Sequence, residues 1–173
     1  MCPTVPVSGC PCLCPAAPTA ARAVSTRRPG ISSTASPGEA QIQQILKLLD
    51  RSYIRGLSLL GGEPFEPANQ RALLPLLRRT RNELPGKTIW CYSGYTLDGE
   101  LWQPSRARCE ATDEMLSLLD VLVDGEFVAA QKDLSLRFRG SANQRIIDVP
   151  KSLAARQVVL WDGAMTVEPI TAR

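Results

Sequence analysis

The pattern of hydrophobic and polar positions changes near residue 38 and divides the chain into two parts. Residues 1–38 contain no Asp or Glu, are dominated by Pro, Ala, Ser, Thr, Arg and Cys, and show no hydrophobic period of a helix or a strand. Such a composition is typical of irregular chain, because it offers little apolar surface to bury. The pattern predicts an irregular segment over residues 1–38 and a folded domain over residues 39–173.

Helical periodicity begins directly after this boundary, in the stretch SPGEAQIQQILKLLD. Four hydrophobic residues between Ile42 and Leu49 recur at the spacing of one helix face. Ser36 is predicted to cap this helix, with Pro37 at its first position and Glu39 completing a capping box.

Short hydrophobic runs then alternate with further helical stretches. Three runs, Gly56–Leu60, Ile89–Tyr92 and Val121–Asp124, are predicted to be buried parallel strands that neighbour one another in one sheet. The helix in ANQRALLPLLRRTRNELPG contains Pro75, which predicts a late start or a kink. A third helix, ATDEMLSLL, is predicted to begin with Thr112 as its cap, and RIIDV and RQVVLW are predicted to be late strands. This alternation indicates an α/β fold with a mainly parallel sheet.

The turns GGEP, YSGY and DGEF each follow one of the three predicted strands. Because ligands bind beyond the carboxyl ends of parallel strands, we expect these turns to form one ligand-binding rim. Gly61 and Gly62 would let the backbone approach a ligand closely, and the carboxylate of Glu63 would suit an ammonium group. Two glycines after a strand more often form only a plain tight turn.

The composition narrows the function classes. The chain of 173 residues contains no histidine, which excludes mechanisms that depend on a Ser-His-Asp or Cys-His pair. A net charge of +3 gives no argument for binding nucleic acid or an anionic membrane. No apolar run approaches the ~18 residues of a membrane span, and no secretory signal is recognisable, so we expect a cytoplasmic protein.

Four of the six cysteines lie in the first fourteen residues, at Cys2, Cys10, Cys12 and Cys14. In a reducing compartment such clustering indicates metal binding more than disulfides. Thiolates are the usual ligands of iron–sulfur clusters. Cys10 and Cys14 fit the first interval of a C-x3-C-x2-C loop, which leaves one iron open, but the second interval ends on Ala17. The two later cysteines are interpreted as incidental thiols.

Several longer motifs point to one family. They are VSGC near the N-terminus and, from about Glu39 onward, GLSLLGGEPFEPAN, LPGKTIWCYSGYTLDGEL, LLDVLVDGEFV, DLSLRFRGSANQRIIDVP and VVLW. In these motifs the chain resembles the radical S-adenosylmethionine (SAM) enzymes that activate glycyl radical enzymes. The resemblance is strongest to the activating proteins of anaerobic ribonucleoside-triphosphate reductase, and it implies a partial open (βα) barrel of the radical SAM type.

The resemblance implies an activity as well as a fold. Members hold a [4Fe-4S] cluster, SAM binds its open iron, and one electron cleaves SAM to methionine and a 5′-deoxyadenosyl radical. That radical removes a hydrogen atom from a glycine of the partner reductase. The implied partners are the reductase and a flavodoxin-like or other one-electron donor. The alternatives are an activase of another glycyl radical enzyme, such as pyruvate formate-lyase, and a non-catalytic remnant without a complete cluster site.

The resemblance also implies roles for individual residues. Cys10 and Cys14 match the first two cluster ligands of the family. Gly61, Gly62 and Glu63 match the motif that receives the amino end of SAM.

The chain departs from the family around the third cluster ligand, where Ala16, Ala17 and Pro18 replace a glycine, the cysteine and an aromatic residue. Cys12 in place of the third ligand is one explanation, and a degenerate site over residues 1–38 is another. A third, which the acid-free composition favours, is that the segment is read in a wrong frame. A zinc site made by the four N-terminal cysteines is a fourth, although no standard zinc spacing is present.

Other features have structural interpretations. Trp90, Trp102 and Trp161 are predicted to pack rather than to stack on a nucleotide, and the RRTR run is predicted to be a solvated helix face. Asp124 and Asn143 lie in family-like motifs near the predicted rim, so we expect them to support the site from behind.

Overall fold

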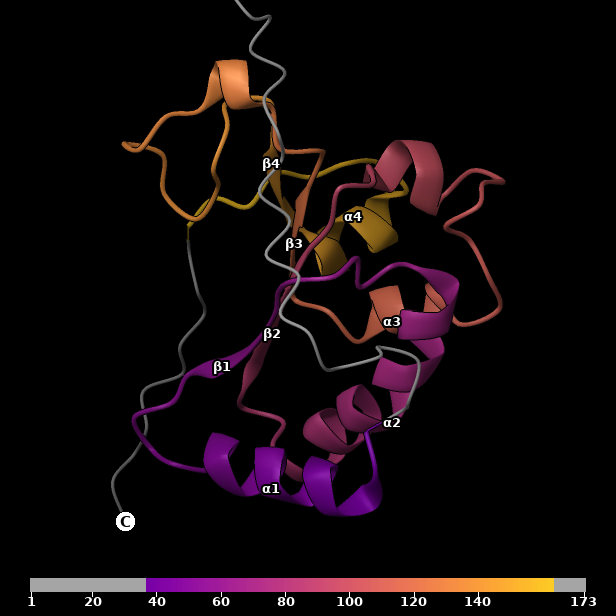
Figure 1. Ribbon diagram of the computed structural model, residues 1–173, viewed down its shortest axis with the longest axis vertical. Helices are drawn as coiled ribbons and strands as arrows, with labels where there is room; N and C mark the ends of the chain where they lie inside the picture. Colours follow the sequence, from indigo (N-terminus) through magenta and orange to yellow (C-terminus); the bar gives the residue numbers. More distant parts are fainter. Residues whose placement is uncertain (1–36, 164–173) are drawn as a thin grey trace, which may run out of the picture. The chain divides into compact units, whose positions relative to one another are not determined.

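The computed structural model describes residues 37–163 (Figure 1). The cysteines Cys10, Cys12 and Cys14 therefore lie outside the described residues, as does the predicted irregular segment except for its last two residues. The strands are β1 (Gly56–Leu59), β2 (Thr88–Tyr92), β3 (Val121–Asp124) and β4 (Arg145–Asp148). The helices are α1 (Glu39–Leu49), α2 (Pro67–Glu83), α3 (Thr112–Ser117) and α4 (Val149–Ala155), with a π-helical turn η1 (Leu97–Leu101) and a 3-10 turn η2 (Ala129–Gln131).

The strands form one open sheet in the order β1-β2-β3-β4. β1, β2 and β3 are parallel neighbours, and β4 adds to β3 in the antiparallel direction. Figure 1 shows β1 at one edge and β4 at the other. The predicted α/β class and the three predicted parallel neighbours are thus confirmed, and the fold is a mostly parallel open sheet of the kind expected for a partial radical SAM barrel. The predicted burial of the first strand is wrong, because β1 is an edge strand in which only Leu59 is buried.

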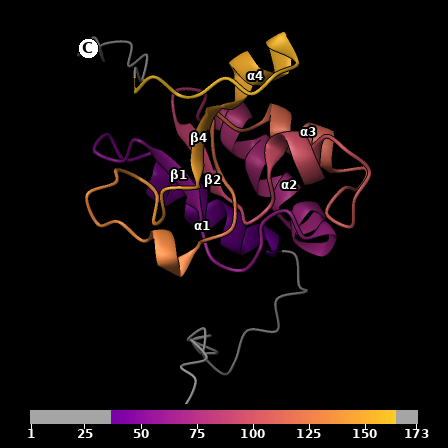
Figure 2. The same cartoon turned by 90° about the horizontal axis from the view of Figure 1, so that it is seen from above.

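One face of the sheet is covered by helices. Leu59, Cys91 and Leu122 are register partners on this face, and all three belong to the main hydrophobic core. Leu77 of α2 and Met115 of α3 pack into the same core and are fully buried. Seen from above, α2 and α3 lie on one side of the strands and the segment after β3 lies on the other (Figure 2). Because side chains alternate along a strand, the remaining strand residues face this second side.

The second face carries a smaller core of aromatic and branched residues. Trp90, Val121 and Val123 are buried there, with Trp161 packed against them. The ring of Trp90 lies 5.2 Å from that of Phe138 and 5.1 Å from that of Trp161, centroid to centroid. The packing interpretation of Trp90 and Trp161 is therefore confirmed.

The start of α1 differs from the prediction. The helix begins at Glu39 with Gly38 as its N-cap, so the predicted cap at Ser36 is wrong. The side chain of Gln41 accepts a hydrogen bond from the Gly38 backbone N–H at 3.0 Å. Gln41, rather than Glu39, is the third residue of the helix and therefore the one whose side chain can reach back to the cap.

The start of α3 differs in the same way. Thr112 is the first helical residue, and Ala111 is the N-cap. The Thr112 hydroxyl instead accepts from the Cys109 N–H at 2.9 Å and donates to the buried Gln70 side chain at 2.8 Å. The hydroxyl is satisfied by Cys109, which precedes its helix, and by α2 rather than by its own helix.

Pro75 lies inside α2, which begins at Pro67 and runs for 17 residues. The predicted late start of this helix is therefore wrong. In residues 37–163, no helix combines the length and the apolar character that a membrane crossing requires.

The prediction of a last strand in RQVVLW is wrong, because these residues form no strand. The predicted RIIDV strand is present as β4, but the next residues form α4, which ends at Ala155 and is followed by Arg156 in a left-handed conformation. Beyond it, Leu160 makes a single isolated bridge to Ile147, supported by a hydrogen bond from the Trp161 N–H to the Ile146 oxygen at 2.9 Å. This single bridge is too short to add a fifth strand to the sheet.

Candidate functional site

The turns that follow β1, β2 and β3 meet at the carboxyl edge of the sheet, as predicted. Together with the segment between β3 and β4 they line a cleft of about 470 Å³. The three turns contribute Leu60, Gly61, Gly62, Glu63, Tyr92, Ser93, Gly94 and Gly125, and the later segment contributes Phe127, Phe138, Arg139, Gly140 and Gln144. The predicted residues Gly61, Gly62 and Glu63 are therefore brought together with residues of two other turns.

Both predicted glycines adopt a backbone conformation that other residues rarely reach. Gly61 has φ +85° and Gly62 has φ +53°. A Cβ added to Gly61 would have no atom within 4 Å, so the backbone there faces open space. The turn thus needs glycine for its conformation, and its backbone is also open to a ligand on the cleft side.

The carboxylate of Glu63 is held in one orientation by three donors. Its Oε1 accepts from the Phe65 N–H at 3.0 Å and from the Ser93 hydroxyl at 2.7 Å. Its Oε2 accepts from the Gly94 N–H at 2.8 Å. An ionised carboxylate can accept about four hydrogen bonds, so Oε2 keeps a site for a further donor in the cleft. An ammonium group would satisfy this site and match the charge.

Two neighbouring contacts fix the partners of Glu63. The Ser93 oxygen accepts from the Tyr95 N–H at 3.0 Å, which leaves the hydroxyl proton for Glu63. Asn69, in α2, donates from its side chain to the Glu63 carbonyl at 2.8 Å. Ser93 and Asn69 were given no role in the sequence analysis, although both lie in the quoted family motifs.

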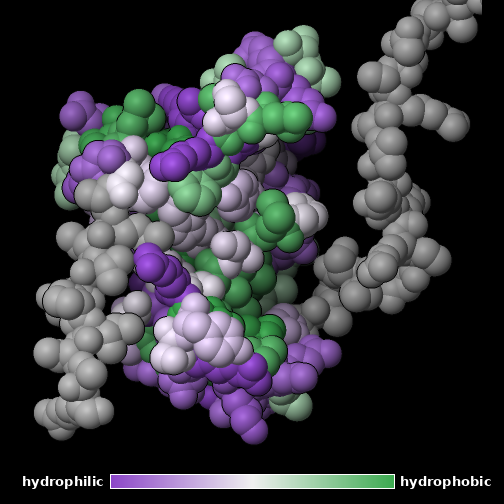
Figure 3. Space-filling model, turned by 90° about the vertical axis from the view of Figure 1, so that its left-hand side faces the viewer, coloured by the Kyte–Doolittle hydropathy of each residue, from purple (hydrophilic) through white to green (hydrophobic). Residues whose placement is uncertain are grey.

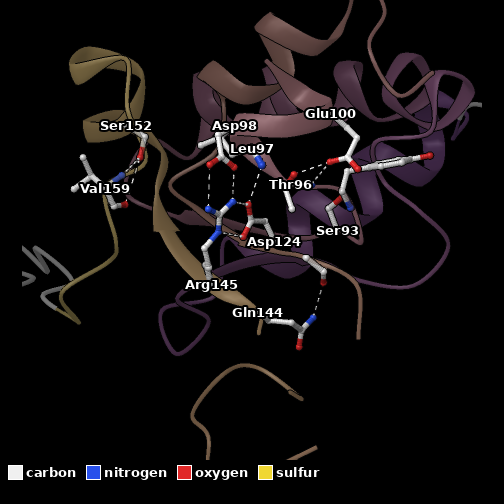
Figure 4. A network of polar contacts seen from close by, with 12 residues as sticks. Ser93, Thr96, Leu97, Asp98, Glu100, Asp124, Gln144, Arg145, Ser152 and Val159 are labelled. Atoms are coloured by element: carbon white, nitrogen blue, oxygen red, sulfur yellow. Dashed lines mark hydrogen bonds and ion pairs between the residues drawn. The ribbon is translucent and has the colours of Figure 1, made fainter. Parts of the chain in front are cut away.

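Behind the cleft lies an ionic cluster around the buried Asp124 (Figure 4). Asp124, at the end of β3, has no exposed surface. Its two carboxylate oxygens accept hydrogen bonds from Arg145 Nε at 2.9 Å and Arg145 Nη2 at 2.6 Å. The same guanidinium contacts Asp98 at 2.7 Å and 3.2 Å. Its hydrogen bonds lower the pKa of Asp98, and the two carboxylates raise the pKa of Arg145. Asp124 therefore lies next to Gly125 of the cleft lining, and its support of the site stays a prediction.

Two side chains hold the segment that forms the far wall of the cleft. Gln144 donates to the Gly125 oxygen at 3.0 Å and accepts from the Gly140 N–H at 2.9 Å. Asn143 donates to the Glu126 oxygen at 2.8 Å. Asn143 therefore shapes the wall, and Gln144, which the sequence analysis did not single out, joins both ends of the segment.

The surface around this wall is partly apolar. Phe127 and Phe138 are each about half exposed, and Leu60 is more exposed still. Figure 3 looks from the left of Figure 1 at the side where β1 and this segment lie, and shows hydrophobic patches among hydrophilic ones.

The RRTR run does not form a free cationic face. Arg78 pairs with Glu114, and Arg79 pairs with Glu39. Arg81 donates to the carbonyl of Leu118. These arginines tie α2 to its neighbours.

The two later cysteines do not group with other metal-binding side chains among residues 37–163. Cys91 is a core residue, and burial raises the pKa of its thiol. Cys109 lies 3.5 Å from the Gln70 side-chain oxygen. In residues 37–163, no three His, Cys, Asp or Glu side chains are grouped to hold a metal ion. Residues 37–163 thus contain no complete ligand set of their own, and Cys10, Cys12 and Cys14 lie outside the described residues.

Comparison with known proteins gives a consistent result. A family described as "4Fe-4S single cluster domain" matches residues 2–147. An anaerobic ribonucleoside-triphosphate reductase-activating protein of Haemophilus influenzae is 46% identical over 106 residues, 60% of this chain and 63% of that protein. Proteins of the same name from Vibrio cholerae and Escherichia coli K12 are 49% identical over 92 residues and 43% identical over 108 residues.

The matched part is smaller than the relatives themselves. It covers 53% of this chain and 54% of the Vibrio cholerae protein, and 61% of this chain and 65% of the Escherichia coli protein. The chain thus spans less than two thirds of the length of these relatives. No solved structure matches it significantly.

Proposed function

We propose that this chain, which belongs to the family of 4Fe-4S single cluster domains, activates an anaerobic ribonucleoside-triphosphate reductase by forming a glycyl radical on it. The names of the relatives support this activity. The observation that carries it in the structure is the Glu63 carboxylate, held by three donors in a cleft at the carboxyl ends of three parallel strands.

In this proposal the GGEP turn holds the amino end of SAM. The open backbone at Gly61 and Gly62 would accommodate the ligand, and Glu63 would accept from its ammonium group. Ser93 keeps the carboxylate turned toward the cleft. A [4Fe-4S] cluster with SAM bound would supply the one-electron chemistry, and the residues of the chain bind, orient and shield the reactants.

The cluster would be held by Cys10 and Cys14, with Cys12 as the candidate for the third ligand because position 17 is alanine. Residues 1–38 would then be a degenerate cluster-binding segment and residues 39–173 the radical SAM core domain. The proposed partners are the reductase and a flavodoxin-like or other one-electron donor in the cytoplasm.

Anaerobic reconstitution tests the cluster part of the proposal. We expect the chain to take up little iron and to cleave SAM far more slowly than the Escherichia coli relative, because three thiolates are needed to hold the cube. Ala17→Cys should restore activity only in part, since Ala16 and Pro18 also depart from the family pattern. If Cys12 is the third ligand, Cys12→Ser should abolish the four-iron spectrum. Normal SAM cleavage that survives Cys12→Ser would contradict this account.

Incubation with the partner tests the activity itself. The reconstituted chain, a reductant and SAM should produce a glycyl radical signal in the electron paramagnetic resonance spectrum of the reductase. A signal on pyruvate formate-lyase instead would favour the other activase. Tight binding to the reductase without iron uptake or radical formation would identify a non-catalytic remnant.

A further inference from the structure

We propose that Arg145 is a positioning residue for Glu63. Together with Asp98 and Asp124 it fixes the turn after β2, and this turn holds the Glu63 carboxylate from Ser93 and Gly94. The consequence for ligand affinity rests on the proposed function, whereas the positioning itself does not.

The first step is the ionic cluster, which joins three separate parts of the chain. Arg145 begins β4, Asp124 ends β3, and Asp98 lies in η1. One guanidinium makes paired contacts to each carboxylate, from 2.6 Å to 3.2 Å. Such forked arginine–carboxylate contacts fix geometry as well as charge. Asp124 is fully buried, whereas the Asp98 side chain is about half exposed, so Asp124 is the fixed point of the cluster.

The second step leads from the cluster to the turn. Asp124 Oδ2 also accepts from the Leu97 N–H at 2.8 Å. The next residue, Gly125, donates its N–H to the Tyr95 oxygen at 3.2 Å. The end of β3 thus holds residues 95–97 at two points, and Arg145 holds the end of β3.

The third step leads from the turn to the carboxylate. The Tyr95 N–H orients the Ser93 hydroxyl, which donates to Glu63 at 2.7 Å. The Gly94 N–H donates to Glu63 at 2.8 Å, and a Cβ on Gly94 would lie 3.5 Å from the same oxygen. A shift of this turn would therefore weaken both hydrogen bonds that cross from β2 to Glu63.

A purely structural role for Arg145 would predict something different. Asp124 needs a cationic partner because it is buried, and that need alone would make Arg145 important for stability. A structural role predicts lower stability with an unchanged Glu63 site in the molecules that remain folded. The positioning role predicts a changed Glu63 site even when stability is preserved.

The test follows the amide proton of Gly94 in nitrogen–proton correlation spectra of the full chain at constant pH. The variants are Arg145→Met and the double variant Asp124→Asn with Arg145→Met, which avoids an unpaired buried charge if the single variant does not fold. The spectrum of Glu63→Ala shows the resonance position of the Gly94 amide when its hydrogen-bond acceptor is missing. Arg71→Met is the control, because Arg71 also makes a forked contact, to Glu110, but at the α2 surface away from the cleft.

We expect the Gly94 amide to move toward its Glu63→Ala position in a folded Arg145 variant and to stay in place in Arg71→Met. An unchanged Gly94 amide in a folded Arg145 variant overturns the proposal. The backbone resonances of residues outside the rim show whether each variant is folded.

Equilibrium dialysis with labelled SAM supplies the second readout. Affinity should fall about tenfold in the Arg145 variants, as expected for the loss of roughly one hydrogen bond to a charged group. If Glu63→Gln lowers SAM affinity and the Arg145 variants do not, the positioning role for the ligand is overturned. If Glu63→Gln itself leaves SAM affinity unchanged, the proposed function fails, and the Gly94 resonance still decides whether Arg145 positions Glu63.

Discussion

Replacing Glu63 with glutamine is the most direct test of the rim, because it removes the charge and keeps the shape. The remaining side-chain oxygen can still accept from the Phe65 N–H and the Ser93 hydroxyl, which both contact Oε1. The new amide nitrogen then replaces Oε2 and faces the Gly94 N–H, so that two donors meet. The substitution therefore affects the side of the carboxylate on which the ammonium is proposed to bind.

The expected loss falls on the ligand rather than on the fold. A hydrogen bond to a charged group is worth roughly 1.5–3 kcal/mol, and each ~1.4 kcal/mol is a tenfold change in affinity. SAM affinity should thus weaken about 10- to 150-fold. The Gly94 contact is exposed to the cleft, so water can replace the lost acceptor. We expect the free energy of unfolding to change by less than ~1 kcal/mol.

Two measurements decide the outcome: equilibrium dialysis with SAM and iron content after anaerobic reconstitution. Iron content should not change, because the thiolates are untouched. Glu66→Gln is the matched control, since Glu66 lies in the same turn but accepts from the Tyr95 hydroxyl at 3.1 Å and does not line the cleft. Loss of iron in Glu63→Gln, or SAM affinity equal to that of the unmodified chain, would refute the assignment of this turn.

The remaining predictions concern stability and are measured by urea unfolding. Gly56→Ala should destabilise the protein by about 1–3 kcal/mol, because a Cβ there would lie 2.0 Å from a backbone oxygen of β2; Gly86→Ala, which meets open space, should change little, and equal costs would speak against the reasoning. Hydrogen bonding to Arg71 lowers the pKa of Glu110 from 4.5 to about 2. The pair therefore stabilises the fold above about pH 4.5 and loses this effect as the pH falls toward 2. Glu110→Gln should cost stability at pH 7 and much less near pH 2, and a cost independent of pH would exclude this linkage.

The parallel strands could be predicted from the sequence because each is a short hydrophobic run bounded by turn residues. Gly56–Leu59, Thr88–Tyr92 and Val121–Asp124 differ from their predicted ranges by one residue at most. Burial on both faces favours such runs, as in β3, where all four residues are buried, whereas β1 lies at the edge and buries only Leu59. The common edge of the three following turns then follows from the direction of the strands alone.

The first residues of the helices were less predictable, because several neighbouring residues can each serve as the N-cap. Gly38 caps α1 instead of Ser36, and Gln41 provides the reciprocal contact. Thr112 is drawn into a contact with Gln70, 42 residues away in sequence. The late RQVVLW run has strand character, but α4 brings it back to β4 for only one bridge.

The sequence by itself determined the residues of the GGEP turn and the family motifs, including the alanine in place of the third cluster cysteine. Only the tertiary structure decided what holds Glu63, since Ser93 and Gly94 are about thirty residues away along the chain. Only it joined Arg145 to Asp98, at a separation of 47 residues. Periodicity and turn residues report the local backbone and its burial. Which charges meet depends on how the ends of β3 and β4 pack against η1, and no local pattern encodes that arrangement.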